Sequence, residues 1–187
     1  MQPSAQASPA TGAYAHEKAL PIVGILAVAD CPTDVETSLS GLLGPAIERG
    51  GPWDFDATDY YAPEMGRTLR RSFLAFPPHV PDLVAWKLAT GEIERARRAP
   101  DGGRRINLDP GYVSLGGLFL ASTKPAPHRI HLARGIHAEI TLFYGRGAWQ
   151  RLPWTFPDFR SGRYDAFLSA CRERLKRALR CGGPDAS

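Results

Sequence analysis

Polar and apolar residues alternate along residues 128–142, and this pattern limits how the segment can fold. Successive side chains of a β-strand point to opposite faces, so the alternation predicts strands at 128–132 and 136–142, each with one buried face. Between them, Gly135 supplies the left-handed conformation needed at the third position of a three-residue hairpin loop. Counting outward from the loop predicts these pairs: Leu132 with Ile136, His131 with His137, Ile130 with Ala138, and Arg129 with Glu139. In this register Arg129, His131, His137 and Glu139 share one polar face. A slip of one residue would move the side chains of one strand to the other face, so the polar faces of the two strands would no longer coincide.

The rest of the chain shows strand and helix patterns in turn. Strands are predicted at 22–29, 53–58, 70–76 and 105–109, and helices from Thr33 onward, at 81–99 and at 163–180. The segment 114–123 fits either a short apolar helix or a strand. The order of the first six elements is βαββαβ, the ferredoxin-like arrangement, in which two helices cover one face of an antiparallel sheet. We therefore predict an α+β fold: a ferredoxin-like core with an added β-hairpin and a C-terminal helix, in a single mainly antiparallel sheet.

Length and composition predict one domain. A chain of 187 residues with 43% hydrophobic content can bury one core, which we place at 20–180. Residues 1–19 are rich in small and polar residues, without the basic start and apolar run of a signal peptide. We expect this lead-in and the tail at 181–187 to be disordered. The three cysteines share no metal-binding or CxxC spacing, and the longest apolar run, 21–29, is too short to cross a bilayer. These features favour a cytoplasmic protein without a membrane partner.

Three carboxylates are candidate catalytic groups: Asp59, Asp109 and Glu139. Asp59 follows a predicted strand, where a carboxylate is either a general base, a magnesium ligand or the cap of a turn. Asp109 precedes Pro110 and Gly111, so it is either a turn-forming residue or a catalytic one. Glu139 should face Arg129. Such a pair is either a cross-strand ion pair contributing about 0.2–1 kcal/mol or an Arg fork that binds an anion while Glu139 orients it.

The candidate ligand-binding residues are Lys124, His128, Arg129, Tyr112, Trp154 and Arg160. Lys124 and His128 flank the stiff 125–127 linker, and a Lys there suits a phosphate or carboxylate unless it is simply a solvated loop residue. Tyr112 and Trp154 would pack against the ligand. Aromatic residues around Trp154 either fill the core or, beside Arg160, form a wall that accepts a base or ring.

The histidine pair raises the question of a metal. As cross-strand neighbours, His131 and His137 would need Asp109 or Glu139 to complete a metal shell, and the simpler interpretation is a stacked pair on the polar face. Metal ligands usually show a tighter sequence spacing than this. The sequence therefore predicts no metal ligand and identifies no cofactor.

Four segments carry a resemblance to a known family. They are DATDYYAPEMG (56–66), RRINLDPGY (104–112), TKPAPHRIHLARGIHAEITL (123–142) and WTFPDFRS (154–161). They resemble the bacterial and archaeal proteins described as domain of unknown function 4416, over about residues 21–179. The resemblance implies no established reaction. Members sometimes carry a "GTP-binding" label, but this chain has neither a GxxxxGK[ST] loop nor an NKxD motif. The positions of His131 and His137 are often aromatic in the family, which argues against metal binding.

Two classes of function remain open from the sequence. The first is a small enzyme or binder for an anionic ligand that bears a phosphate or carboxylate, nucleotides included, in a pocket of mixed acids and bases. The second is an RNA- or protein-binding module that uses a sheet face and the basic helix residues Arg172, Lys176 and Arg180. That stripe is also what a solvated helix face looks like, and the sheet segments lack the paired exposed aromatics of base-stacking modules. We therefore favour the pocket.

Overall fold

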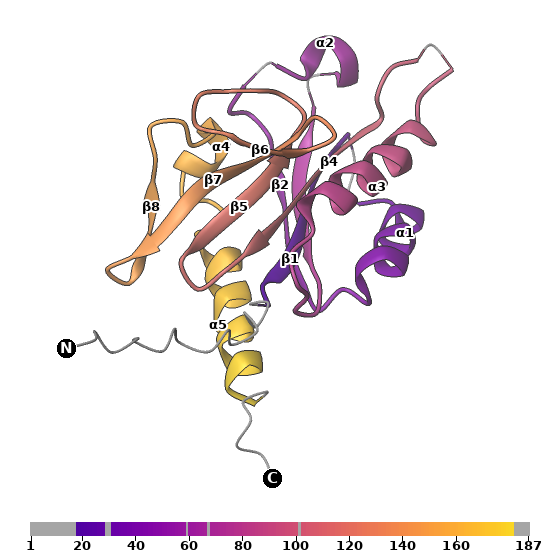
Figure 1. Ribbon diagram of the computed structural model, residues 1–187. Coiled ribbons are helices and arrows are strands. Elements are labelled where there is room, and N and C mark those ends of the chain that lie inside the picture. The colour runs from indigo at the N-terminus through magenta and orange to yellow at the C-terminus, as the bar shows by residue number, and fades with distance from the viewer. Residues whose placement is uncertain (1–17, 29–30, 59, 67, 101, 182–187) are drawn as a thin grey trace, which may run out of the picture.

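The structure is a computed structural model that describes residues 18–28, 31–58, 60–66, 68–100 and 102–181 (Figure 1). Its strands are β1 (Leu20–Ala27), β2 (Glu48–Asp54), β3 (Arg70–Ala75), β4 (Ile106–Val113), β5 (Gly117–Ser122), β6 (Ile130–Ala133), β7 (Ile136–Gly145) and β8 (Ala148–Arg151). Its helices are α1 (Thr33–Leu43), α2 (Ala62–Met65), α3 (Leu83–Arg95), α4 (Pro157–Arg160) and α5 (Asp165–Cys181). The predicted α+β class is confirmed.

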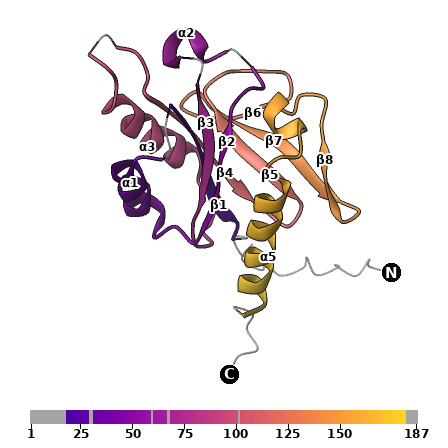
Figure 2. The same ribbon diagram turned by 180° about the vertical axis from the view of Figure 1, so that it is seen from behind.

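All eight strands belong to one sheet. The order is β2-β3-β1-β4-β5-β7-β6, and β8 also pairs with β7. Each of the pairings between these strands is antiparallel, as the sequence predicted. Helices α1 and α3 lie on one side of the sheet and α5 on the other, as the two opposite views show (Figures 1 and 2).

Strand β1 is central because both of its faces are apolar. Every residue of β1 is buried. Val23 and Ile25 pack into a core with residues of α1 and α3, whereas Leu20 and Ile22 pack into a second core with residues of α5. Because successive side chains of β1 point to opposite faces of the sheet, this one strand contributes to both cores. The sheet is thus the middle layer between α1 and α3 on one side and α5 on the other.

Two strands depart most from their predicted bounds. The strand expected at 53–58 lies earlier, as β2, and the strand expected to end at Asp109 continues as β4 to Val113. The Asp-Pro-Gly sequence suggested a turn, but Pro110 is accommodated inside β4. Pairing with β5 starts only at Gly111, so Pro110 has a partner strand, β1, on one side alone and no second ladder requires its missing amide. The ambiguous segment 114–123 contains a strand, β5.

The predicted hairpin forms with a shorter loop. Ile130 pairs with Ala138 and His131 with His137, as predicted, but Ala133 replaces Leu132 as the partner of Ile136. The loop is therefore two residues, Arg134 and Gly135, with φ of 55° and 74°, as a type I′ turn requires, and the register shifts at Leu132. All four residues of β6 are exposed, so the expectation of a buried face on that strand is wrong. The reason is that β6 is the last strand in the sheet order, with a neighbour on one side only.

The polar face of the hairpin is as predicted. Ile136 and Ala138 pack toward the core beneath α1 and α3. His137 and Glu139 alternate with them and therefore face the opposite side of the sheet. This places Glu139 on the side where the cavity described below opens.

Close packing of β4 against β5 depends on Gly111, which gives a testable prediction. A Cβ at Gly111 would lie 2.2 Å from the backbone oxygen of Phe119, and a backbone atom cannot move aside easily. We expect Gly111→Ala to lower the free energy of unfolding by about 1–3 kcal/mol, the usual range for overpacking. The matched control is Gly41→Ala in α1, where a Cβ meets nothing within 4 Å. It should stabilise the protein by about 0.5–1 kcal/mol. Urea unfolding of both variants tests this, and equal stability of Gly111→Ala and the wild type would contradict it.

Candidate functional site

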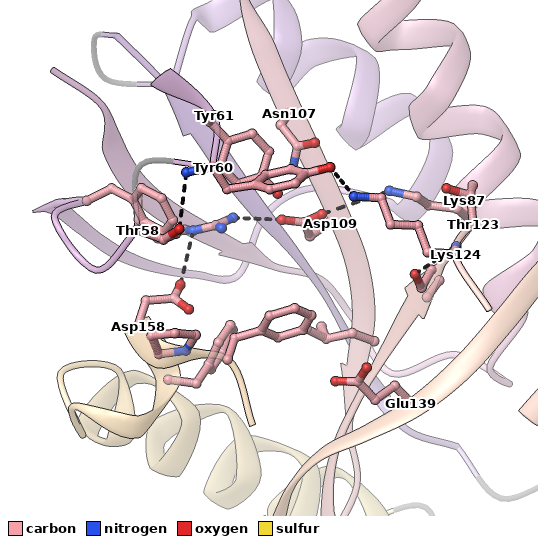
Figure 3. Close-up of a pocket in the computed structure, with 18 of the residues that line it drawn as sticks. Thr58, Tyr60, Tyr61, Lys87, Asn107, Asp109, Thr123, Lys124, Glu139 and Asp158 are labelled. Atoms are coloured by element: carbon pink, nitrogen blue, oxygen red, sulfur yellow. Dashed lines mark hydrogen bonds and ion pairs between the residues drawn. The ribbon is translucent and has the colours of Figure 1, made fainter. Parts of the chain in front are cut away.

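A cavity of about 470 Å³ lies where β4 and β5 diverge (Figure 3). Strand β4 begins at Ile106 but pairs with β5 only at Gly111–Val113, so the first part of β4 separates from its neighbour. The charged and amide side chains that line the cavity are those of Arg71, Lys87, Glu94, Arg104, Asn107, Asp109, Lys124, Arg129, Glu139 and Asp158. The cavity thus collects ionisable groups from both halves of the chain.

Helix α3 supplies the hydrogen bonds that β5 does not make with the diverging part of β4. The backbone N–H of Leu108 donates to Oε1 of Glu94 at 2.5 Å, and the Leu108 carbonyl accepts from Nζ of Lys87 at 2.8 Å. A buried backbone group without a partner is costly, so these side chains make the divergence possible. Burial raises the pKa of Glu94. The hydrogen bonds to Leu108 hold the side chains of Lys87 and Glu94 at the cavity wall. There, Nζ of Lys87 lies 3.9 Å from Oδ1 of Asp109.

A buried arginine faces two carboxylates at the base of the cavity. Nη1 of Arg71 donates to Oδ2 of Asp109 at 2.9 Å, and its Nε lies 3.8 Å from Oδ2 of Asp158. Arg71 is only 4% exposed. Gly24, the partner of Asp109 in β1, leaves room for the guanidinium, because a Cβ there would lie 3.1 Å from Nη1. Arg71 therefore donates a hydrogen bond to Asp109 alone, and its contact with Asp158 is a longer ion pair.

The two carboxyl groups consequently have pKa values shifted in opposite directions. Burial alone would raise the pKa of Asp109, but attraction to Arg71 and Lys87 outweighs it, and the net effect lowers the pKa. Burial raises the pKa of Asp158, and the attraction of Arg71 does not offset this, since the negative charge of Asp109 raises the pKa further. Tyr164 donates its hydroxyl hydrogen to Asp158 at 3.3 Å. Asp109 is therefore the carboxylate of this pair that stays ionised most readily.

Glu139 forms a second cluster on the neighbouring strands. Its Oε2 accepts from Nε of Arg129 at 2.7 Å and lies 3.1 Å from Nε2 of His128. Nη1 of Arg129 also donates to the carbonyl of Lys124 at 2.9 Å. The His128 ring stacks on Trp154, with centroids 5.0 Å apart and planes 9° apart. Because Glu139 is buried and bonded on two sides, it holds Arg129 and His128 in place.

The remaining cations lie nearer the exposed loops. Nη2 of Arg104 donates to Oε2 of Glu64 at 2.6 Å, and its Nη1 donates to Oδ1 of Asn107 at 3.0 Å. Lys124 donates from Nζ to the hydroxyl of Tyr60, and this bond lowers the pKa of Tyr60. Within the described part of the chain, Lys124 has no carboxylate partner, unlike the arginines of the cavity.

The structure brings four of the sequence-predicted residues together: Asp109, Glu139, Lys124 and Arg129 all line the cavity. His128 contacts Glu139 and Trp154 stacks on the His128 ring, but neither residue lines the cavity. Trp154 donates from Nε1 to the carbonyl of Ile140, which fixes the indole against β7.

The other predicted residues lie elsewhere. Tyr112 stacks on Phe119 with centroids 4.8 Å apart, outside the cavity lining. Arg160 donates to the carbonyls of Thr155 and Pro153, so its guanidinium stabilises the segment before α4. Asp59 lies outside the described residues.

The sequence patterns did not select five charged residues of the cavity: Arg71, Lys87, Glu94, Arg104 and Asp158. A signal existed for Arg71, because it alternates with Phe73 and Ala75 on a strand whose face is buried, where a charge needs a partner. No comparable signal marks Lys87 and Glu94, which look like ordinary polar positions of an amphipathic helix.

The described residues contain no group of three or more His, Cys, Asp and Glu side chains that could hold a metal ion. The rings of His131 and His137 lie 5.1 Å apart at 61° and contact each other edge to face. All three cysteines are free thiols. In the part of the chain that is described, no helix has both the length and the apolar character needed to cross a bilayer.

Comparison with known proteins places the chain in a family. The family described as "Domain of unknown function (DUF4416)" matches residues 17–175, which is most of the chain. The protein belongs to this family, as the resemblance of the four segments predicted. No curated protein and no solved structure gives a significant match.

The role of Arg71 can be tested by removing its charge. Arg71→Met would leave the buried Asp158 without its cation and Asp109 with Lys87 alone, and we expect a loss of about 3–5 kcal/mol in the free energy of unfolding at pH 7. In the wild type, the lowered pKa of Asp109 contributes stability above the pKa of the unfolded carboxyl, and this contribution is lost as the pH falls through the folded pKa. Without Arg71 the pKa of both carboxyls should rise, so the deficit of the variant should shrink on acidification.

Chemical unfolding between pH 7 and pH 4 measures this difference. Arg95→Met is the matched control, since Arg95 pairs with Glu92 on the exposed surface of α3 and should change stability little at either pH. A deficit of Arg71→Met that does not depend on pH would show that the carboxylates do not cause it.

Proposed function

We propose that the cavity binds a small molecule carrying an anionic group, a phosphate or a carboxylate, so that the protein is a small binder or an enzyme. The observation that carries this proposal is the charge arrangement at Lys124. Arg71, Arg104 and Arg129 are each paired with a carboxylate, whereas the ammonium of Lys124 meets only a neutral hydroxyl among the described residues. An anionic ligand would supply the missing partner.

Size and chemistry support the same proposal. A volume of 470 Å³ falls within the range of about 300–1,000 Å³ typical of small-molecule sites. Asp109 is ionised and its side chain is 27% exposed, so it can accept a hydrogen bond or a proton from a bound molecule. If the protein is an enzyme, Asp109 is the candidate base. Glu139 is enclosed by its partners and would act by positioning Arg129.

We also infer that the unit from β1 to β4 is ferredoxin-like. Its strands have the order β2-β3-β1-β4 with antiparallel neighbours, α1 follows β1 and α3 follows β3, and the short α2 is an addition between β2 and β3. The single domain at 20–180 and its cytoplasmic location stay predictions, and the three free thiols fit a reducing compartment.

The RNA- or protein-binding alternative receives no specific support. Arg172, the first residue of the proposed basic stripe, donates from Nε to the carbonyl of Leu115 and lies 3.8 Å from the ring centroid of Tyr144. These contacts commit Arg172 to holding α5 against the sheet. The stripe is therefore better explained as packing and surface charge than as a binding face.

Lys124→Met gives a direct test. The exposed Lys124 side chain makes its described contacts with Tyr60 alone, so its loss should leave the melting temperature nearly unchanged. Asp109→Asn is a less selective variant, because it also weakens the buried bond to Arg71. We expect citrate, ribose 5-phosphate or AMP to raise the melting temperature of the wild type relative to sodium chloride at equal ionic strength. A ligand at one hundred times its Kd adds about 2.7 kcal/mol of stability.

The expected shift should disappear in Lys124→Met and persist in Lys176→Met, which removes an equal charge from α5. A thermal-shift titration of the three proteins distinguishes these outcomes. The proposal fails if none of the compounds stabilises the wild type, or if the two lysine variants lose the response equally.

A further inference from the structure

Two aromatic side chains at the cavity keep much of their surface exposed to solvent. Tyr60 is 58% exposed and Phe156 is 39% exposed, and both line the cavity. Phe156 makes no ring contact with another aromatic residue in the described ranges. Large apolar side chains are usually removed from water, so a ligand that covers both rings would gain binding free energy.

Neighbouring rings hold Tyr60 at the cavity wall. Tyr60 packs edge to face on Tyr61 with centroids 5.0 Å apart, and Tyr61 packs in the same way on Phe55 at 5.9 Å. Phe55 and Tyr61 also line the cavity. The ammonium of Lys124 lies 4.2 Å from the ring centroid of Tyr60, so the cation and the aromatic surface are adjacent (Figure 3). A ligand that reaches Lys124 with its anionic group therefore meets this aromatic wall next.

Hydrogen-bonding groups of opposite kind lie at the base of the same cavity. Asn107 and Asp109 are two residues apart on β4 and share one face. Oδ1 of Asn107 accepts from Arg104, which can only donate, so the other amide atom is the donor Nδ2. Nδ2 makes no hydrogen bond of ordinary geometry, in a residue that is 5% exposed, and the interaction of the Asn107 amide with the Asp109 carboxylate lowers the pKa of Asp109. Asp109 is ionised and accepts. The base of the cavity therefore offers a donor beside an acceptor.

We propose that the ligand contains a nitrogen heteroaromatic ring joined to its anionic group, with the ring packed between Tyr60 and Phe156, its heteroatoms facing Asn107 and Asp109, and the anion bound by Lys124. This inference rests on the proposed function and specifies its ligand class. An aliphatic anion would leave both rings exposed and would offer no ring heteroatom to Asn107 and Asp109. A carbocyclic aromatic acid would cover the rings but could not satisfy Asn107 and Asp109 together.

The test compares ligands that share a phosphate and differ in the ring. Binding of AMP, GMP, CMP, UMP, ribose 5-phosphate and inorganic phosphate to the full chain is measured by isothermal titration calorimetry. We expect at least one nucleoside monophosphate to bind tenfold or more tightly than ribose 5-phosphate, since stacking of one base on an aromatic side chain is worth about tenfold or more. If ribose 5-phosphate binds as tightly as every nucleotide and Lys124→Met weakens all of them, the anion site stands and the ring inference is overturned. If no compound binds, both fail.

Variants locate the ring. Phe156→Leu and Tyr60→Leu should each weaken the preferred nucleotide about tenfold while leaving the affinity for ribose 5-phosphate within a factor of two to three, because they remove ring surface and keep the anion site. Phe143→Leu is the control, since Phe143 is also exposed, at 47%, but lies on β7 outside the cavity lining. Circular dichroism confirms that each variant is folded. Equal weakening by Phe143→Leu and Phe156→Leu, or no weakening by either cavity variant, overturns the inference.

Discussion

The buried guanidinium of Arg71 is the charge on which the candidate site depends. It lies on β3, the second strand in the sheet order, and faces Asp109 on β4 and Asp158 on α4. Burying a cation without partners costs several kcal/mol, so the native position of Arg71 requires both carboxylates to be in place. Asp158 comes from a segment late in the chain, and its contact with β3 ties that segment to the sheet. The contact between Arg71 and Asp158 thus contributes both to the electrostatics of the cavity and to the attachment of α4, so a change in one should alter the other.

The cavity exists because α3 allows β4 to leave β5. A strand that separates from its neighbour exposes backbone donors and acceptors, and inside a domain these need other partners. Lys87 and Glu94 are seven residues apart, two turns along one face of α3, and together they satisfy both backbone groups of Leu108. At Gly111 the strands come together again, where only a residue without a Cβ permits the approach. The opening is therefore bounded by specific contacts at its wall and at its closed end.

Local sequence patterns predicted the three long helices, the strands other than β5 and β8, and four of the nine charged residues that line the cavity. Alternation gave the polar face with Arg129 and Glu139 and the pairing of Ile130 with Ala138, because these depend only on neighbours in the chain. Asp109 was selected because it precedes Pro110 and Gly111, and Lys124 because it flanks the stiff 125–127 linker. Local patterns could not predict that β4 lies beside β1 or that α3 reaches Leu108, since these contacts depend on the order of strands in the sheet. The turn expected at Pro110 was wrong for a related reason: a proline is acceptable inside a strand wherever the second neighbour is missing, and only the sheet order reveals that.

Charge pairing also explains why binding would not disturb the fold. The arginines of the cavity already have carboxylate partners, so a ligand need not break those pairs to enter. At Lys124 the present acceptor is the neutral hydroxyl of Tyr60, and an ionised oxygen forms a hydrogen bond roughly twice as strong. An anion would therefore replace the Tyr60 hydroxyl as the acceptor for the ammonium, while the neighbouring rings of Tyr61 and Phe55 keep Tyr60 at the cavity wall. Only exposed side chains would move in this exchange, while the buried pairs of Arg71 and Arg129 keep the walls in place. The buried ion pairs would stay in place, and only the exposed contact between Lys124 and Tyr60 would be replaced. Such a cavity resembles small-molecule sites that are largely formed before the ligand binds.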